Sequence, residues 1–324
     1  MTKPILISGI QPTGRLHLGN YLGALKNFVE LQNSGKYQCF FFIADYHSLT
    51  EDFDAKEKMR QILDLTANYL AAGLDPKKSV IFLQSDVPEC TELFWILNAL
   101  APQGEMERMT QFKDKSKHQP ENVNMGLLNY PILMAADILL YDAVYIPIGK
   151  DQQQHLELAR TLARKFNNRF GKTFIEPQAV FTKTPRLLSL NNLDKKMSKS
   201  QPEGCLFLDD SPEEIKKKIS RAVTDSGSEI KFDEQNKPGL SNLLLIYEAL
   251  SGETIANLEK KYAGKGYGQF KSDLANVVAD ALEPFRNPKT SNLKLKNLLV
   301  AGSKKANKIA SAKMKEVKKK LGLL

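Results

Sequence analysis

Cysteine is scarce in this sequence. Its 324 residues include three cysteines, Cys39, Cys90 and Cys205, which stand singly and far apart. This spacing excludes a disulfide framework and a zinc site built from closely spaced pairs, and it favours a reducing compartment. Because Cys39 falls in an apolar run, we interpret it as a small buried hydrophobic residue.

Long apolar runs are also absent. No segment approaches the roughly 20 consecutive apolar residues that cross a bilayer. The N-terminus enters the apolar segment 5–7 without the basic region and cleavage site of a signal peptide. We therefore expect a cytoplasmic protein with no membrane partner. Apolar residues still make up 42% of the chain, enough for a large core and a second, smaller domain.

Acidic residues are outnumbered, since 46 Lys and Arg face 37 Asp and Glu, for a net charge of +9. This excess favours a polyanionic partner, because basic side chains that neutralise phosphates release counterions. A solvated, lysine-rich surface explains the same numbers, so charge alone does not identify the partner.

Short runs rich in Ile, Leu, Phe and Val alternate with helical patterns in the first half of the chain. The predicted strands cover 4–8, 39–44, 80–83 and 145–148, and the predicted helices cover 19–34 and 55–72. Because the strands are continuous apolar runs, helices should cover both faces of a parallel sheet. The sequence thus predicts an α/β fold with a doubly wound, Rossmann-like sheet. Ligands of such sheets bind beyond the carboxyl ends of the strands.

Strand signals nearly vanish after residue 205. A helix start at Ser211 is followed by helical patterns over 215–223, 240–250, 254–262 and 269–282. The segment 264–268 (GKGYG) lacks a preceding strand, which favours a turn between helices over a phosphate loop. The tail 294–320 holds ten lysines and one acidic residue, with apolar residues at three- and four-residue intervals. This pattern predicts an amphipathic helix with a basic outer face.

These patterns divide the chain into three parts. We predict a Rossmann-like domain over 1–205, a mainly helical domain over 206–292, and a basic amphipathic helix over 293–324 that packs back on the first domain.

The segment 12–20 (PTGRLHLGN) is the first candidate for ligand chemistry. It follows the first predicted strand and opens a helix, so glycines let a phosphate approach the backbone and helical N–H groups can face it. His17 and Asn20 stand three residues apart and can face one ligand. An ordinary strand-to-helix turn with an incidental histidine gives the same pattern.

The second candidate is the segment 194–204 (DKKMSKSQPEG). Lysines flanked by hydroxyl residues can close over a triphosphate and stabilise charge on a pyrophosphate leaving group. Alone, the segment also fits a solvated basic loop. Together, HLGN behind the first strand and KMSKS far downstream resemble the paired signature of class I aminoacyl-tRNA synthetases.

The resemblance narrows to the bacterial tryptophanyl-tRNA synthetases, and it spans nearly the whole chain. The segments that carry it are 8–14 (SGIQPTG), 109–113 (MTQFK), 130–141 (YPILMAADILLY), 149–155 (GKDQQQH) and 264–268 (GKGYG). Asn20 stands where other class I enzymes have a histidine. Its amide can donate to a phosphate or ribose oxygen but cannot act as an acid.

The resemblance implies roles for individual residues. It places His17, Asn20, Lys113, Lys196 and Lys199 at the phosphates or at developing charge. The implied ATP site is formed by Gln11, Pro12, Thr13, Gly19, Asn20, Gly149, Lys150, Asp151, Leu188, Lys196, Met197, Ser198, Lys199 and Ser200. Mg²⁺ is expected to arrive with ATP, and no protein metal site is expected.

For tryptophan, the resemblance points to Asp137. This residue lies in an apolar helical pattern, where a buried carboxylate needs a hydrogen-bond donor. The indole N–H of tryptophan only donates, so it suits an acceptor-only carboxylate. A structural Asp paired to an Arg or a backbone N–H stays open as an alternative. The remaining pocket residues implied are Ile7, His47, Gln111, Tyr130, Met134 and Ile148.

The implied function is ATP-dependent activation of L-tryptophan and its transfer to tRNA(Trp). The helical domain would bind tRNA, and the family is homodimeric. Three alternatives remain at this point: a tyrosyl-tRNA synthetase with the same signature pair, a non-catalytic synthetase-like RNA-binding protein, and another adenylyl-transferring enzyme of similar fold.

Overall fold

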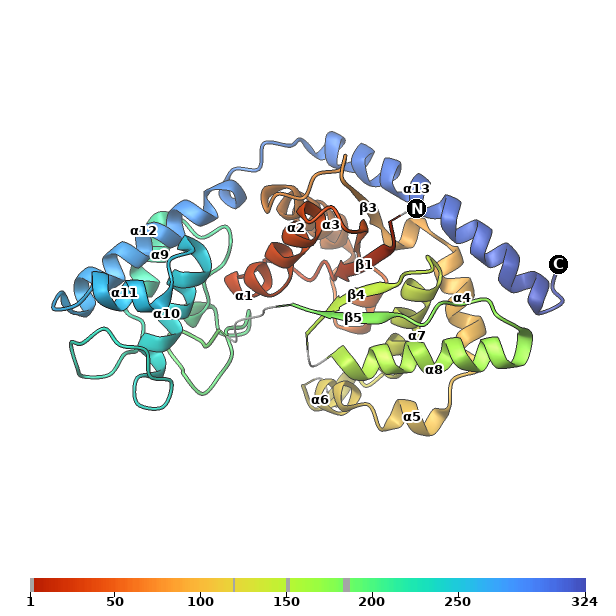
Figure 1. Ribbon diagram of the computed structural model, residues 1–324, viewed down its shortest axis with the longest axis horizontal. Helices are drawn as coiled ribbons and strands as arrows, with labels where there is room; N and C mark the ends of the chain where they lie inside the picture. The colour runs from red at the N-terminus through yellow and green to blue at the C-terminus, as the bar shows by residue number, and fades with distance from the viewer. Residues whose placement is uncertain (1–2, 119, 150–151, 183–186) are drawn as a thin grey trace. The chain divides into compact units, whose positions relative to one another are not determined.

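The computed structural model describes residues 3–118, 120–149, 152–182 and 187–324 (Figure 1). The chain forms two compact units. Unit 1 comprises Met1–Thr13, Phe28–Thr182 and Thr290–Leu324, and unit 2 comprises Gly14–Asn27 and Lys183–Lys289. The contacts therefore group 14–27 and 183–205 with the helical residues, whereas the sequence suggested divisions near 205 and 292. The functional roles of the predicted domains stay predictions.

Unit 1 is built on a five-stranded sheet with the strand order β3-β2-β1-β4-β5. The strands are β1 (Ile5–Ile10), β2 (Gln38–Ile43), β3 (Ser79–Leu83), β4 (Tyr145–Ile148) and β5 (Gln178–Phe181). All neighbours pair in parallel, with Ile7 opposite Phe40 and Phe40 opposite Val80. This arrangement confirms the predicted Rossmann-like sheet. The sequence patterns did not reveal β5.

The helices of unit 1 connect and cover these strands. They are α3 (Ala55–Ala71), α4 (Glu89–Asn98), α5 (Gln103–Glu107), α6 (Thr110–His118), α7 (Met125–Leu139), α8 (Gln153–Phe170) and α13 (Asn292–Lys320). Two 3-10 turns, η2 (His47–Thr50) and η3 (Gln84–Asp86), follow β2 and β3. The core joins inward residues of the strands with α4, α7, α8 and α13. Cys39 of β2 is buried, as predicted.

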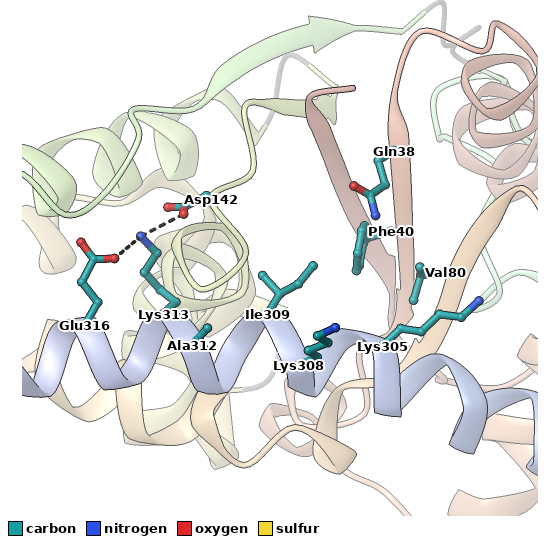
Figure 2. Close-up of a pocket in the computed structure, with 10 residues that line it drawn as sticks. All are labelled: Gln38, Phe40, Val80, Asp142, Lys305, Lys308, Ile309, Ala312, Lys313 and Glu316. Carbon is teal, nitrogen blue, oxygen red and sulfur yellow. Dashed lines mark hydrogen bonds and ion pairs between the residues drawn. The ribbon is translucent and has the colours of Figure 1, made fainter. Parts of the chain in front are cut away.

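The C-terminal helix α13 packs along β3 and α4 (Figure 1). Its Lys313 is buried, and its Nζ lies 2.9 Å from Asp142 Oδ2 and 2.8 Å from Glu316 Oε2 (Figure 2). Burial works against this charge, but the bonds to Glu316 and Asp142 outweigh it and raise the pKa of Lys313. The ion pairs anchor the helix on its inner face.

A pocket of about 580 Å³ lies beside these ion pairs, between α13 and the amino-terminal ends of β2 and β3 (Figure 2). Gln38, Val80 and Lys308 line it. Ligands of doubly wound sheets bind at the opposite, carboxyl ends of the strands. The pocket therefore lies away from the predicted substrate site.

Unit 2 is mainly helical. It contains α1 (Leu18–Asn20), a π-helical turn at Tyr21–Leu25, α9 (Pro212–Ser220), α10 (Pro238–Ser251), α11 (Ile255–Lys261) and α12 (Gly266–Arg286). The helix α2 (Lys26–Asn33) begins in unit 2 and continues into unit 1. The single helix predicted over 19–34 is thus a short α-turn, a π-turn and α2.

The predicted start of α9 is confirmed, because Ser211 and Glu214 form a reciprocal capping box. The predicted turn near residue 264 is also present, with Gly264 at φ +75°. However, α12 begins at Gly266, earlier than predicted. In the described parts of the chain, none of the helices combines the length and apolarity of a membrane span.

Candidate active site

The carboxyl ends of four parallel strands in unit 1 each lead into a predicted or newly found candidate site residue. Gln11 follows β1, His47 follows β2, Gln84 follows β3 and Gly149 follows β4. Adjacent parallel strands end at the same edge of a sheet, which brings such residues together. His47 and Gln84 do meet, at the carboxylate of Asp137.

Asp137 is 4% exposed and lies near the end of α7. Its Oδ2 is 2.8 Å from His47 Nε2, and Gln84 Nε2 donates to both carboxylate oxygens at 2.9 Å. Cys90 Sγ donates to Oδ1 at 3.0 Å. Among the described residues, the carboxylate thus has three side-chain partners, and none of them is the Arg or backbone N–H of the structural alternative.

Three predicted pocket residues share one face of α7, because Tyr130, Met134 and Asp137 are spaced by four and three residues. The ring of Tyr130 stands edge-on to that of His47, with centroids 6.3 Å apart. Ile7 and Ile148 are buried on β1 and β4 in the same core cluster. An acceptor carboxylate flanked by aromatic and apolar side chains suits a ring that carries one N–H donor.

Behind Tyr130 lies a second buried histidine that sequence reasoning did not assign. Tyr130 Oη is 3.2 Å from His155 Nε2, and His155 Nδ1 is 2.8 Å from Gln152 Oε1. Since the amide oxygen of Gln152 only accepts, Nδ1 carries the proton and Nε2 accepts from the Tyr130 hydroxyl. This series of hydrogen bonds fixes the orientation of the Tyr130 ring.

Two predicted residues stand on a helix that contributes no partner to Asp137. Gln111 is half-buried and Lys113 is exposed, both on α6. Among the described residues, neither shares a hydrogen bond with Asp137 or its partners. Lys150 and Asp151 lie outside the described residues. The Gln152 N–H donates to the Gly149 carbonyl at 3.1 Å, before α8 begins.

Gln84 and Cys90 are the residues of this cluster that the sequence did not suggest. Gln84 directly follows β3, so its place at a strand carboxyl end was a signal that could have found it. Cys90 offered no such signal, because a lone cysteine in an apolar helix is most often only a small core residue.

Unit 2 joins the first signature segment to the part of the chain that directly follows the second. The backbone N–H of Leu18 donates to the carbonyl of Leu206 at 2.8 Å, and His17 forms an antiparallel bridge with Phe207. Leu206 and Phe207 follow the Lys-Met-Ser-Lys-Ser loop by a few residues. Segments almost two hundred residues apart are therefore held by backbone hydrogen bonds.

His17 has a defined protonation state in this setting. Burial, and secondarily the charge of Lys199, lower the pKa of His17 to about 4. Gly19 N–H donates to His17 Nδ1 at 3.1 Å, which leaves the proton of the neutral ring on Nε2. Asn20 Oδ1 accepts from the His17 backbone N–H at 3.1 Å, so the group that Asn20 can offer a ligand is its amide N–H₂.

The loop that carries Lys196 and Lys199 is anchored by its neighbours. Leu188 bridges to Lys196, and the Met197 N–H donates to Leu187 O at 3.0 Å. Met197 is 5% exposed, whereas Lys196 and Ser200 are exposed and Ser198 and Lys199 are half-buried. The buried methionine thus fixes the loop and leaves its lysines at the surface of the unit.

The other predicted nucleotide residues follow β1. Thr13 N–H donates to Gln11 O at 3.0 Å in a turn that also contains the buried Pro12, and Gly19 lies in α1. Gln11, Pro12 and Thr13 belong to unit 1, while Gly19 belongs to unit 2. Within the described ranges, no three His, Cys, Asp or Glu side chains gather as metal ligands would.

The sheet and the paired segments define a class. The model of the family described as tRNA synthetases class I (W and Y) matches residues 1–283, so the chain belongs to the class I aminoacyl-tRNA synthetases. The tryptophan–tRNA ligase of Oceanobacillus iheyensis is 50% identical over 324 residues, covering 98% of each chain. Within the class, this chain belongs to the tryptophanyl-tRNA synthetases, which are tryptophan–tRNA ligases.

Solved structures agree with this assignment. The tryptophanyl-tRNA synthetase of Mycoplasma pneumoniae matches with a TM-score of 0.88 at 38% identity, covering 99% of this chain and 98% of that one. The enzyme of Campylobacter jejuni, crystallised with ADP and tryptophan, matches with a TM-score of 0.84 at 39% identity, covering 98% and 100%. The tyrosine and non-catalytic alternatives are not supported.

Proposed function

We propose that Asp137 binds the indole N–H of L-tryptophan. The observation that carries this proposal is a buried carboxylate held by three side chains, with Tyr130 and Met134 beside it on one helix face. A buried acceptor of this kind discriminates strongly against ligands that lack the matching donor. Ile7, His47 and Ile148 complete the pocket, and Gln111 is assigned to it by resemblance alone.

ATP is the second substrate in this proposal. The Nε2–H of His17 and the amide of Asn20 donate to its phosphates. Lys196 and Lys199 balance the charge of the pyrophosphate leaving group, with Lys113 as a further lysine. The adenosine is assigned to the strand ends, at Gln11–Thr13 and Gly149–Asp151. The Lys-Met-Ser-Lys-Ser loop and its neighbour form another side of the ATP site, through Leu188, Met197, Ser198 and Ser200.

The described polar side chains of this set are a histidine, amides, hydroxyls and lysines, which suit a triphosphate, and they include no carboxylate, the side chain that hard cations bind most readily. They fit a nucleotide that brings its own Mg²⁺, held by phosphate oxygens. When bound, that ion would neutralise phosphate charge.

The reaction follows from these groups. A carboxylate oxygen of tryptophan attacks the α-phosphorus, the bond to the β-phosphate oxygen breaks, and pyrophosphate leaves. A hydroxyl of the terminal tRNA ribose then attacks the acyl carbon, and AMP leaves. Neither step requires a covalent enzyme nucleophile, so the contribution of the protein is positioning and charge stabilisation.

Three further assignments belong to this proposal. The helical residues of unit 2 bind tRNA(Trp), which fits the basic net charge of the chain. The active enzyme is a homodimer, as the family resemblance implies. Because its macromolecular substrate is tRNA, we place the enzyme in the cytoplasm.

The test is ATP–pyrophosphate exchange with each of the twenty amino acids. We expect a response to tryptophan, and we expect Lys199→Ala to lower that rate by about 10²-fold or more, because it removes stabilisation of transition-state charge. Lys216→Ala, an exposed lysine on α9, is the matched control. Exchange with tyrosine instead, or a normal rate in Lys199→Ala, would contradict the proposal.

A further inference from the structure

We propose that Gln84 is a positioning residue for the choice of tryptophan, because its amide fixes the orientation of the Asp137 carboxylate. The inference rests on the proposed role of Asp137 as acceptor for the indole N–H. Neither the sequence patterns nor the resemblance assigned a role to Gln84.

The geometry of Gln84 sets it apart from the other partners of Asp137. His47 contacts Oδ2 and Cys90 contacts Oδ1, whereas Gln84 Nε2 lies 2.9 Å from both oxygens. The last torsion of an aspartate side chain is soft, so contacts that each reach one oxygen, the Cys90 thiol being a weak donor, restrain the carboxylate less than a donor that bridges both. A donor shared by both oxygens fixes its plane.

The orientation of the Gln84 amide is itself determined. The backbone N–H of Tyr46 donates to Gln84 Oε1 at 3.1 Å. A backbone N–H can only donate, so the amide oxygen must face Tyr46 and the N–H₂ group must face Asp137. Gln84 is 1% exposed, and water cannot take over either contact without a change in packing.

The turn that carries Gln84 is held on both sides. Ser85 N–H donates to Asp45 Oδ1 at 3.0 Å, and Ser303 of α13 donates to Asp86 Oδ2 at 2.8 Å. These bonds tie η3 to the loop after β2 and to the C-terminal helix. The Gln84 amide is therefore presented from a fixed backbone, as a precise hydrogen-bond geometry requires.

A positioning role of Gln84 differs from a purely structural one in which ligands lose affinity when Gln84 is replaced. If Gln84 orients the acceptor, its loss weakens binding of ligands that donate an N–H to Asp137. The same loss of Gln84 should weaken binding less for a ligand of the same shape that lacks this N–H. 3-Benzothienyl-L-alanine is such a ligand, because sulfur replaces the indole N–H.

The experiment compares the Kd of L-tryptophan and of 3-benzothienyl-L-alanine by calorimetry, in wild type and in Gln84→Met. Methionine keeps the length of the side chain and removes the donor. We expect the preference for tryptophan to fall by about tenfold, the value of one hydrogen bond to a charged group. Gln103→Met, an exposed glutamine of the same unit, should leave the preference unchanged.

Equal losses of affinity for both ligands would show a structural role and overturn the proposal. If Gln84→Met does not fold, Gln84→Asn tests the same point, since its shorter amide cannot span both contacts. Asp137→Asn tests the proposed role of Asp137 separately from the proposed role of Gln84. An unchanged preference in Asp137→Asn refutes the role of Asp137, whereas a loss there with none in Gln84→Met refutes only the role of Gln84.

Discussion

The protonation of His17 shows how local environment sets what a single residue can do. Because its pKa lies at about 4, the ring is neutral at physiological pH and offers one N–H rather than a positive charge. In our proposal the charges at the triphosphate thus come from Lys196 and Lys199, and His17 contributes a directed hydrogen bond. The sequence identified His17 but could not give its charge, which depends on burial and on a lysine 182 positions away.

This shift predicts a pH dependence of stability. An unfolded histidine titrates near 6.5, so between about pH 6.5 and 4 the unfolded chain binds a proton that the folded chain does not. The contribution of His17 to stability is therefore present above pH 6.5 and is lost as the pH falls toward 4. We expect the difference in unfolding midpoint between wild type and His17→Gln to be larger at pH 7.5 than at pH 4.5.

The comparison uses thermal unfolding of both proteins at each pH. All other titrating groups are common to the two chains, so their contributions cancel in the difference. A difference that stays constant between the two pH values would show that His17 titrates normally in the fold.

Asp137 illustrates the limit of sequence reasoning at the same scale. Its helical, apolar surroundings predicted a buried carboxylate that needs a donor, and the structure confirms this. Its partner Gln84 was open to prediction only as a residue at a strand carboxyl end, and Cys90 could not be predicted, because the two lie about fifty residues earlier in the chain. Only the packing of α7 against α4 and against the turn after β2 brings the partners of Asp137 together.

At the scale of elements, the strands with strongly apolar sequences were predictable and the others were not. β1 to β4 are runs of large apolar residues. β5 (QAVF) is a half-exposed edge strand with a short and weak pattern. The first helix was predicted as continuous because its apolar spacing is regular, but the backbone widens into a π-turn at Tyr21–Leu25. Such local departures leave little trace in hydrophobic periodicity.

The contact between α13 and β3 provides a test of element packing. A Cβ added at Gly302 would lie 1.8 Å from the carbonyl oxygen of Ile81, so only glycine allows this approach. We expect Gly302→Val to lower the free energy of unfolding by about 2 kcal/mol or more, because the helix must move off the strand. Urea unfolding measures this change.

Ala301→Val is the matched control, since Ala301 is the exposed neighbour on the same helix. Helix propensity alone would make Ala301→Val the more costly of the two changes, because alanine favours a helix more than valine does and glycine less. Similar losses in the two variants would mean that the close approach to β3 does not limit stability. Because Ser303 ties α13 to η3, we also expect Gly302→Val to weaken tryptophan binding through Gln84.

At the scale of the whole molecule, the two proposed substrates use the two units differently. The proposed tryptophan residues and the three partners of Asp137 all belong to unit 1. The proposed ATP residues are divided, with Gln11–Thr13 and Gly149 in unit 1 and His17, Asn20 and the lysine loop in unit 2. The sequence could not show this division, because it depends on contacts between segments near 17 and 206.

This division predicts that binding of tryptophan can be separated from its activation. Lys199→Ala should leave the Kd of tryptophan, measured by equilibrium dialysis without ATP, within about twofold of wild type, because the hydrogen bonds of Asp137 lie entirely in unit 1. The same variant should lose pyrophosphate exchange.

Asp137→Asn should instead weaken tryptophan binding by about tenfold or more, since a buried acceptor loses its charge. The Kd of ATP should stay nearly unchanged in this variant. If Lys199→Ala weakened tryptophan binding as much as Asp137→Asn does, the amino-acid site could not be a property of unit 1 alone, and the assignment of the two substrates to these residues would have to be redrawn.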